Sequence, residues 1–267
     1  MFKRIRIAIL LYILLFVAVG QFLAAYRTTD WDKSLRVNVY PINASGSVAT
    51  QQFIDALDRD AFQDAELFLE EQATAYGVSL RQPVRIRLAE QLDEIPPAVP
   101  AGSGVLQTML WSLKMRWYVT KLHWSSDSPT PDVTVLALYH DEADGVLLDR
   151  STALRKGLIA VANLYAVRTE RGANKMIVAH ELLHTLGATD KYDLATGLPV
   201  YPSGFAEPNR APLYPQARAE LMAGRIPLQQ SAAEQPKSLR SVMIGPETAL
   251  EIGWIDQLPD AAPSLIR

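Results

Sequence analysis

The chain has 267 residues, a formal net charge of -3 at pH 7 and no cysteine. This length allows one sizeable core, and the lack of a basic excess argues against a nucleic-acid partner. Without cysteine there can be no disulfide, no thiol catalysis and no thiolate metal site, so any transition metal must be held by His, Asp or Glu.

The N-terminus carries a basic flank followed by twenty uncharged, mostly apolar residues, Ile7 to Tyr26. A run of this length is typical of a transmembrane helix, and the positive flank is expected to stay in the cytoplasm. We therefore expect residues 1–27 to be a cytoplasmic flank and transmembrane signal anchor in the inner (cytoplasmic) membrane. Residues 28–267 would form a single domain on the periplasmic or extracellular side. The alternative is a signal peptide cleaved after Gly20, which would give a secreted protein.

From residue 28 onward, strand-like and helix-like segments alternate along the chain. β-branched and apolar runs predict strands at Leu35–Ile42, Pro83–Glu90, Asp132–His140 and Gly157–Val167. Apolar residues at helical spacing predict one helix or a pair of helices over Val48–Tyr76, and another helix over Val105–Trp124. The alternation predicts an α+β or α/β fold with a mixed sheet.

The helix predicted over Val105–Trp124 has aromatic residues at helical spacing: Trp111, Trp117, Tyr118 and Trp124. Such a stripe could be a ligand platform, but packing in the core is its more common role. We therefore expect these four side chains to be buried.

Helix signals also surround residues 174–186, where Asn174 is expected as the N-cap and Gly187 as the left-handed residue after the helix. The chain from Asp190 to about Pro215 is proline-rich and irregular. Beyond it, a short helix is expected within Tyr214–Leu228, and a last short helix within Gly245–Trp254.

Within the helix over residues 174–186, His180, Glu181 and His184 form an H-E-x-x-H pattern. Residues i and i+4 lie on one helix face, so both imidazoles can bind one ion while Glu181 stands beside it. Zinc with an open position acidifies a bound water, and a neighbouring carboxylate can take the proton. Asp190, three residues after Gly187, is well placed to be the third ligand.

The pattern also has a simpler interpretation, in which the two histidines lie on a helix surface and form a structural ion pair. The other two histidines, His123 and His140, are expected to be hydrogen-bonded core or surface residues.

The residues His180, Glu181, His184, Gly187 and Asp190 resemble the extended H-E-x-x-H-x-x-G-x-x-H/D signature of the metzincin zinc peptidases. The aspartate variant is most similar to the immune inhibitor A and snapalysin types. The resemblance implies a mixed twisted sheet with a zinc-binding active-site helix, with Zn²⁺ on the two histidines and Asp190 and with Glu181 as general base. In the thermolysin-like clan the third ligand is a glutamate further downstream, so Glu207 or Glu220 could serve instead.

The same resemblance implies a methionine turn beneath the metal. Met222, in "AELMAG", resembles the turn of leishmanolysin-like peptidases, and Met243, in "RSVMIG", is the alternative. Tyr192 could orient Asp190, stabilise an oxyanion or simply pack. By analogy, the strand over Gly157–Val167 would be the edge strand that pairs with an extended substrate.

These observations predict a membrane-anchored zinc endopeptidase that hydrolyses a peptide or protein substrate with Glu181 as general base. One alternative is a non-catalytic anchored domain in which zinc braces the fold or a partner surface. Another is a zinc hydrolase of a non-peptide envelope amide.

Overall fold

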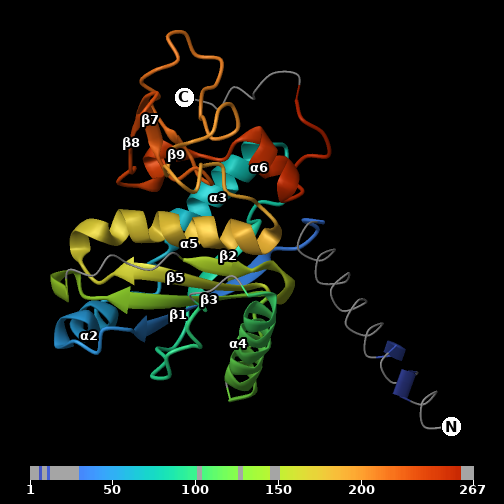
Figure 1. Ribbon diagram of the computed structural model, residues 1–267, viewed down its shortest axis with the longest axis vertical. Helices are drawn as coiled ribbons and strands as arrows, with labels where there is room; N and C mark the ends of the chain where they lie inside the picture. Colours follow the sequence, from blue (N-terminus) through green and yellow to red (C-terminus); the bar gives the residue numbers. More distant parts are fainter. Residues whose placement is uncertain are drawn as a thin grey trace.

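A five-stranded sheet with the strand order β2-β1-β3-β5-β4 forms the centre of the molecule (Figure 1). The computed structural model describes residues 6–7, 11–12, 30–100, 104–125, 129–144 and 151–259. Four strands are parallel, namely β1 (Leu35–Asn43), β2 (Val84–Leu88), β3 (Val133–His140) and β5 (Ile159–Tyr165). The edge strand β4 (Thr152–Leu154) is antiparallel to β5. The mixed sheet agrees with the predicted α+β class.

Helices cover both faces of this sheet. In Figure 1, α3 (Gln63–Ala75) and α5 (Arg171–Leu186) lie above it and α4 (Val105–Ser125) below it, with α2 (Val48–Asp55) at one end. The predicted pair of helices over Val48–Tyr76 is thus α2 and α3. Short 3-10 helices lie at Glu142–Asp144, Arg155–Gly157, Arg168–Glu170 and Leu239–Ser241.

Because side chains alternate along a strand, β3 supplies two cores. Val133, Val135 and Ala137 belong to the larger core with α3 and α5, whereas Leu136 belongs to a second core with α4. A strand covered on both faces is apolar throughout, which explains the continuous run that made β3 recognisable.

A smaller C-terminal unit packs on the side of α5 that faces away from the sheet (Figure 1). It contains β6 (Ala219–Glu220), β7 (Ile226–Gln229), β8 (Ala232–Glu234), β9 (Val242–Met243) and α6 (Pro246–Glu251). The helix expected within Gly245–Trp254 is confirmed as α6. The helix expected within Tyr214–Leu228 is wrong, because this stretch holds β6, a turn and β7. Its backbone bonds to other segments, as where Leu221 N donates to the Met243 carbonyl (2.8 Å).

Asn174 does not cap α5, which begins one turn earlier at Arg171. The Asn174 side chain bonds instead to the backbone of Tyr165 on β5, donating to its carbonyl (2.8 Å) and accepting from its N–H (3.3 Å). Asn174 therefore fixes α5 to the sheet. The predicted end of the helix is confirmed, since Gly187 has φ +116.

Two further expectations are corrected. The strand over Gly157–Val167 is not the edge, because β5 lies between β3 and β4. Of the four aromatic residues on α4, Trp111 and Tyr118 are buried, but Trp117 and Trp124 are 63% and 75% exposed. Helical spacing alone could not separate the two sets, since α4 is apolar on both faces.

The predicted single-pass membrane localisation is also corrected. Among the residues that the structure describes, no helix combines the length and apolar character needed to span a bilayer. The longest, α4, has 21 residues but carries Lys114, Arg116 and Lys121. Of the predicted anchor, Ile7–Tyr26, nearly all lies outside the described residues.

Candidate metal centre

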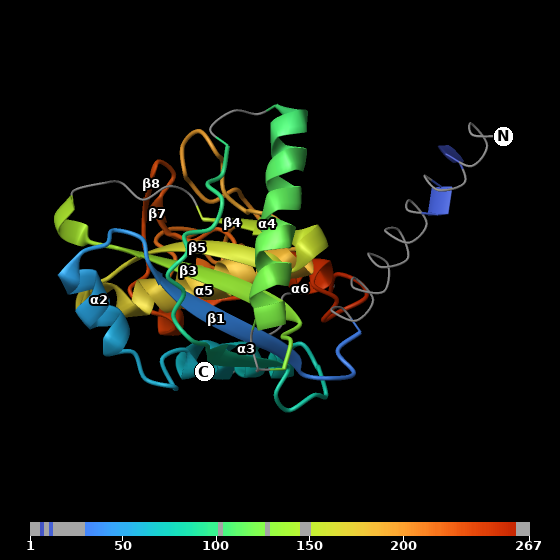
Figure 2. The same cartoon turned by 90° about the horizontal axis from the view of Figure 1, so that it is seen from below.

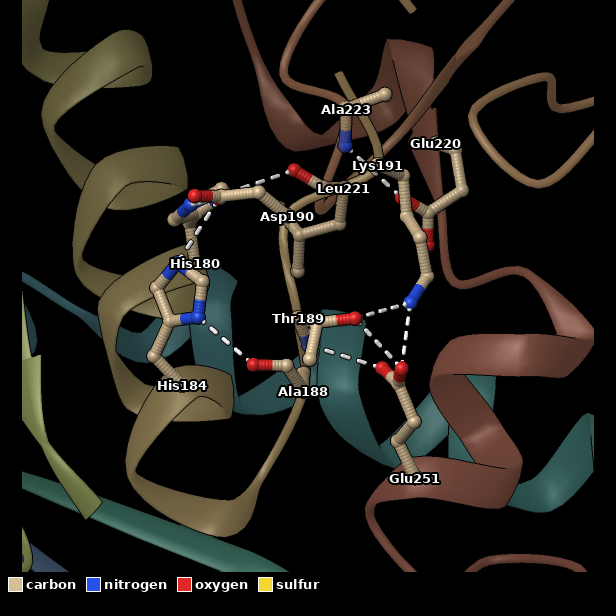
Figure 3. Close-up of polar contacts among 10 residues, drawn as sticks. All are labelled: His180, His184, Ala188, Thr189, Asp190, Lys191, Glu220, Leu221, Ala223 and Glu251. Atoms are coloured by element: carbon tan, nitrogen blue, oxygen red, sulfur yellow. Dashed lines mark hydrogen bonds and ion pairs between the residues drawn. The ribbon is translucent and has the colours of Figure 1, made fainter. Parts of the chain in front are cut away.

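Two backbone carbonyls orient the histidines of α5. His180 Nδ1 lies 2.9 Å from the Leu221 oxygen, and His184 Nδ1 lies 2.8 Å from the Ala188 oxygen (Figure 3). A carbonyl only accepts hydrogen bonds, so in each neutral ring Nδ1 carries the proton and Nε2 presents its lone pair. This is the orientation that metal-binding histidines adopt in proteins.

The carboxylate of Asp190 lies against both of these Nε2 atoms. Its Oδ1 is 3.2 Å from His180 Nε2 and 3.0 Å from His184 Nε2. Ligands of a tetrahedral ion with bonds of about 2.0–2.1 Å are about 3.3 Å apart, close to these separations. The three atoms therefore have the spacing of three ligands of one ion.

The turn at Gly187 makes this approach feasible. Its positive φ lets the chain leave α5 and return Ala188 and Asp190 toward the histidines. A Cβ at Gly187 would lie only 2.7 Å from the guanidinium of Arg155. The backbone conformation therefore favours glycine at this position, whereas the guanidinium is the movable end of an exposed side chain.

Glu181 stands beside the histidines and is 4% exposed. His180, Glu181 and His184 each offer an atom that could hold a metal ion, all within 4.8 Å of one another. Among the described residues, Glu181 Oε2 is buried without a hydrogen-bond partner, which ordinarily costs about 1–3 kcal/mol. A cost of this kind is characteristic of functional sites, so the residues present fit a metal with a neighbouring reactive carboxylate.

Burial and charge shift the titration of these groups. Burial raises the pKa of Glu181, and the neighbouring His180 and His184 offset only part of this effect. For His180, burial lowers the pKa, but Asp190, the Glu181 charge and the Leu221 carbonyl together raise it. Burial raises the pKa of Asp190, yet the hydrogen bonds that His180 and His184 donate from Nε2 when their rings are charged hold this pKa well below the usual range.

A tight turn from Glu220 to Gly224 supports both sides of the site. Leu221 supplies the carbonyl for His180, and the Met222 carbonyl accepts from Lys191 N (3.0 Å). The Met222 side chain is fully buried in the larger core. Met243 lies one strand away on β9, where it pairs with Glu220. Of the two methionines, Met222 is therefore the one whose backbone contacts the Asp190 loop.

The carboxylate of Glu220 holds this turn together from inside the protein. It accepts from Ala223 N (3.0 Å), Gly245 N (3.1 Å) and Thr248 Oγ1 (2.7 Å). Burial raises the pKa of Glu220, and these hydrogen bonds offset part of the rise. Glu220 is thus a structural brace, and the carboxylate that reaches the histidines is Asp190.

Other residues singled out in the sequence lie elsewhere. Glu207 pairs with Arg210 on the surface. His123 Nε2 lies 3.1 Å from Thr134 Oγ1, and His140 Nε2 lies 3.0 Å from Asn163 Oδ1, so both histidines have the partners expected of them.

Glu251 on α6 belongs to the site although the sequence analysis missed it. Its carboxylate accepts from Thr189 N (2.9 Å), Thr189 Oγ1 (2.6 Å) and Lys191 Nζ (2.7 Å), as Figure 3 shows. These partners are the two residues that flank Asp190. Glu251 thus fixes the loop that presents Asp190, from 60 residues beyond Lys191. No local motif marks such a contact.

A cleft of about 330 Å³ opens beside the histidines. His180 and Glu181 line it, as do Tyr192 and Arg225, and Ser151 contributes from the start of β4. Tyr192 therefore shares this cleft with His180 and Glu181. This volume is at the lower end of the range for small-molecule and substrate sites.

No protein-family model matches the chain, and no curated protein matches it significantly. The interpretation of the site therefore depends on its own geometry.

Proposed function

We propose that this protein is a zinc-dependent endopeptidase of the metzincin type, with His180, His184 and Asp190 as ligands of Zn²⁺ and Glu181 as general base. The observation that supports it is the convergence of two carbonyl-oriented imidazoles and one carboxylate oxygen beside a buried glutamate. Met222 would then be the methionine of the turn beneath the metal, and Tyr192 a neighbour of the substrate.

Two imidazole nitrogens and a carboxylate oxygen are ordinary ligands of catalytic zinc, which keeps its fourth position open. When bound, zinc would polarise the scissile carbonyl and acidify a water. The carboxylate of Glu181 would accept a proton from the attacking water. As the water oxygen bonds to the carbonyl carbon and the C–N bond breaks, Glu181 returns that proton to the leaving amine.

The edge strand favours a peptide over other amides. Among the described strands, β4 pairs with β5 alone, so its second edge can pair with an extended chain. Ser151, immediately before β4, lines the same cleft as Glu181. A peptide paired with β4 would therefore run toward the reactive groups, which supports an endopeptidase over a non-catalytic zinc domain.

The first test is the zinc content of the full-length chain and its His184→Ala variant by elemental analysis. We expect close to one zinc per chain in the wild type and a sharp loss in the variant, because an imidazole ligand is removed. His140→Ala is the matched control, since His140 is hydrogen-bonded outside the site. A wild-type chain that folds without zinc or another transition metal would refute the proposal.

Activity is then measured on a mixed peptide library beside amide-linked envelope fragments. Cleavage within the peptides, lost in His184→Ala and kept in His140→Ala, supports the endopeptidase. Cleavage of the envelope amides alone would replace it with the non-peptide hydrolase. Stoichiometric zinc without hydrolysis of either set would favour the non-catalytic domain.

The brace on the Asp190 loop gives a further prediction. The amide in Glu251→Gln accepts hydrogen bonds from Thr189 and from the Lys191 cation less strongly than the carboxylate does. The loop that presents Asp190 is therefore held less firmly. We expect zinc affinity to fall about tenfold, the lower end for groups that orient metal ligands. Competition with a chromogenic chelator measures this affinity. Glu247→Gln, on the same helix, is the control, and equal affinity in the two variants would contradict the role of Glu251.

A further inference from the structure

Helix α4 is apolar on two opposite faces. Its inner face packs on the sheet through buried residues that include Trp111, Met115 and Tyr118. Its outer face carries a row that we name the outer stripe, with every member between 51% and 75% exposed: Leu106, Leu110, Leu113, Trp117 and Trp124. Spacings of three, four and seven place these residues on one side of a helix.

The outer stripe cannot be hidden by rotation of α4. The inner face is anchored by hydrogen bonds from Trp111 Nε1 to the Pro97 carbonyl (2.9 Å) and from the Tyr118 hydroxyl to the Glu94 carbonyl (2.5 Å). Residues 104–110 are all exposed, and one end of α4 extends past the sheet (Figure 2). Such a contiguous apolar surface marks an interaction site.

The charges that α4 itself carries beside the outer stripe are basic. Helical spacing places Lys114 and Lys121 on one side of it and Arg116 on the other, and α4 contains no aspartate or glutamate. Lys121 pairs with Glu94 of the preceding loop (3.1 Å), outside the helix. Since the whole chain has a net charge of -3, this basic character is local.

The basic charges distinguish between two possible partners of the outer stripe, a second copy of α4 and an anionic lipid surface. A second copy of α4 on the outer stripe would bring two sets of lysine and arginine together, which opposes association. An anionic lipid surface has the opposite charge, and it accepts leucine and tryptophan at the depth of the headgroups. Trp117 and Trp124, in edge-to-face contact at 5.9 Å, suit that boundary because tryptophan is enriched there.

We propose that the outer stripe of α4 docks the folded domain onto the surface of an anionic lipid bilayer, with α4 lying in the plane of the interface. Lys114, which is exposed, would reach the phosphate groups while the leucines and tryptophans enter the boundary below them. The contact is peripheral and requires no spanning helix. It does not depend on the proposed peptidase activity, because α4 and the metal centre lie on opposite faces of the sheet (Figure 1).

The absence of cysteine permits a local test on the full-length chain. Leu113→Cys, labelled with an environment-sensitive dye, is mixed with vesicles of phosphatidylglycerol and phosphatidylcholine, or of phosphatidylcholine alone. Leu67→Cys on α3 is the matched control, an exposed leucine on the opposite face of the sheet. We expect a blue shift of the label at position 113 with the anionic vesicles and little change at position 67.

Lys114→Gln, in the Leu113→Cys background, should weaken the apparent affinity for anionic vesicles about fivefold, the usual contribution of one basic residue near the surface. Equal shifts at positions 113 and 67 would mean contact through another part of the chain, and would overturn the proposal. So would a shift at position 113 that depends on protein concentration without vesicles, which would identify a second copy.

Discussion

Glu181→Gln is expected to abolish peptide hydrolysis while the metal stays bound. The amide keeps the size of the buried side chain but cannot take a proton, so kcat should fall about 10²–10⁴-fold, the usual contribution of a general base. The ligands His180, His184 and Asp190 are untouched, and zinc should remain close to one per chain. Steady-state hydrolysis beside elemental analysis measures both quantities.

The combination of results is decisive for Glu181. His184→Ala should lose activity together with zinc, whereas Glu181→Gln should lose activity alone. A Glu181→Gln variant that keeps full kcat would show that the proton is accepted elsewhere. A variant that also loses its zinc would show that Glu181 is a metal ligand. Its carboxylate is close enough for that role, because the ligand atoms of His180, Glu181 and His184 lie within 4.8 Å of one another.

Glu220→Ala should have the largest effect on stability. It removes the acceptor for Ala223 N, Gly245 N and Thr248 Oγ1 and leaves these donors buried. Each unsatisfied buried donor costs about 1–3 kcal/mol. The substitution also removes the cost of burying the Glu220 carboxylate, which offsets part of this loss. We expect the free energy of unfolding to fall by about 3–5 kcal/mol, measured by urea denaturation.

The matched control is Glu220→Gln, which fills the same volume and keeps one acceptor oxygen but turns an NH₂ group toward a donor. The free energy of unfolding should fall less in Glu220→Gln, by about 1–2 kcal/mol. Both variants should also weaken zinc binding, because the turn that Glu220 holds supplies the carbonyl for His180. Wild-type stability in Glu220→Ala would show that the turn is fixed without this carboxylate.

The sequence was sufficient where local chemistry decides the outcome. β1, β3 and α4 follow from runs and periodicities, and the end of α5 follows from Gly187, because a left-handed residue after a helix favours glycine. The convergence of His180 and His184 follows from the i, i+4 spacing on a helix. Asp190 comes only three residues after Gly187, so the short turn keeps it close to both Nε2 atoms.

What the sequence could not show depends on contacts between distant segments. Asn174 has the composition of an N-cap, yet a tertiary bond to β5 decides its role. Glu251 has no local pattern that links it to Asp190. The exposure of Trp117 could not be predicted because both faces of α4 have the same apolar period, and only the position of the sheet distinguishes them.

The sharing of the candidate metal centre between α5 and the C-terminal unit has a consequence for how the site is assembled. Helix α5 alone carries both imidazoles, but the carbonyl that orients His180 comes from Leu221 and the brace of the Asp190 loop comes from Glu251. A chain still emerging from the ribosome would thus hold the reactive side chains without their alignment. The candidate site would be complete only after residues 219–251 have been synthesised, and under the proposed function hydrolysis could not begin before then.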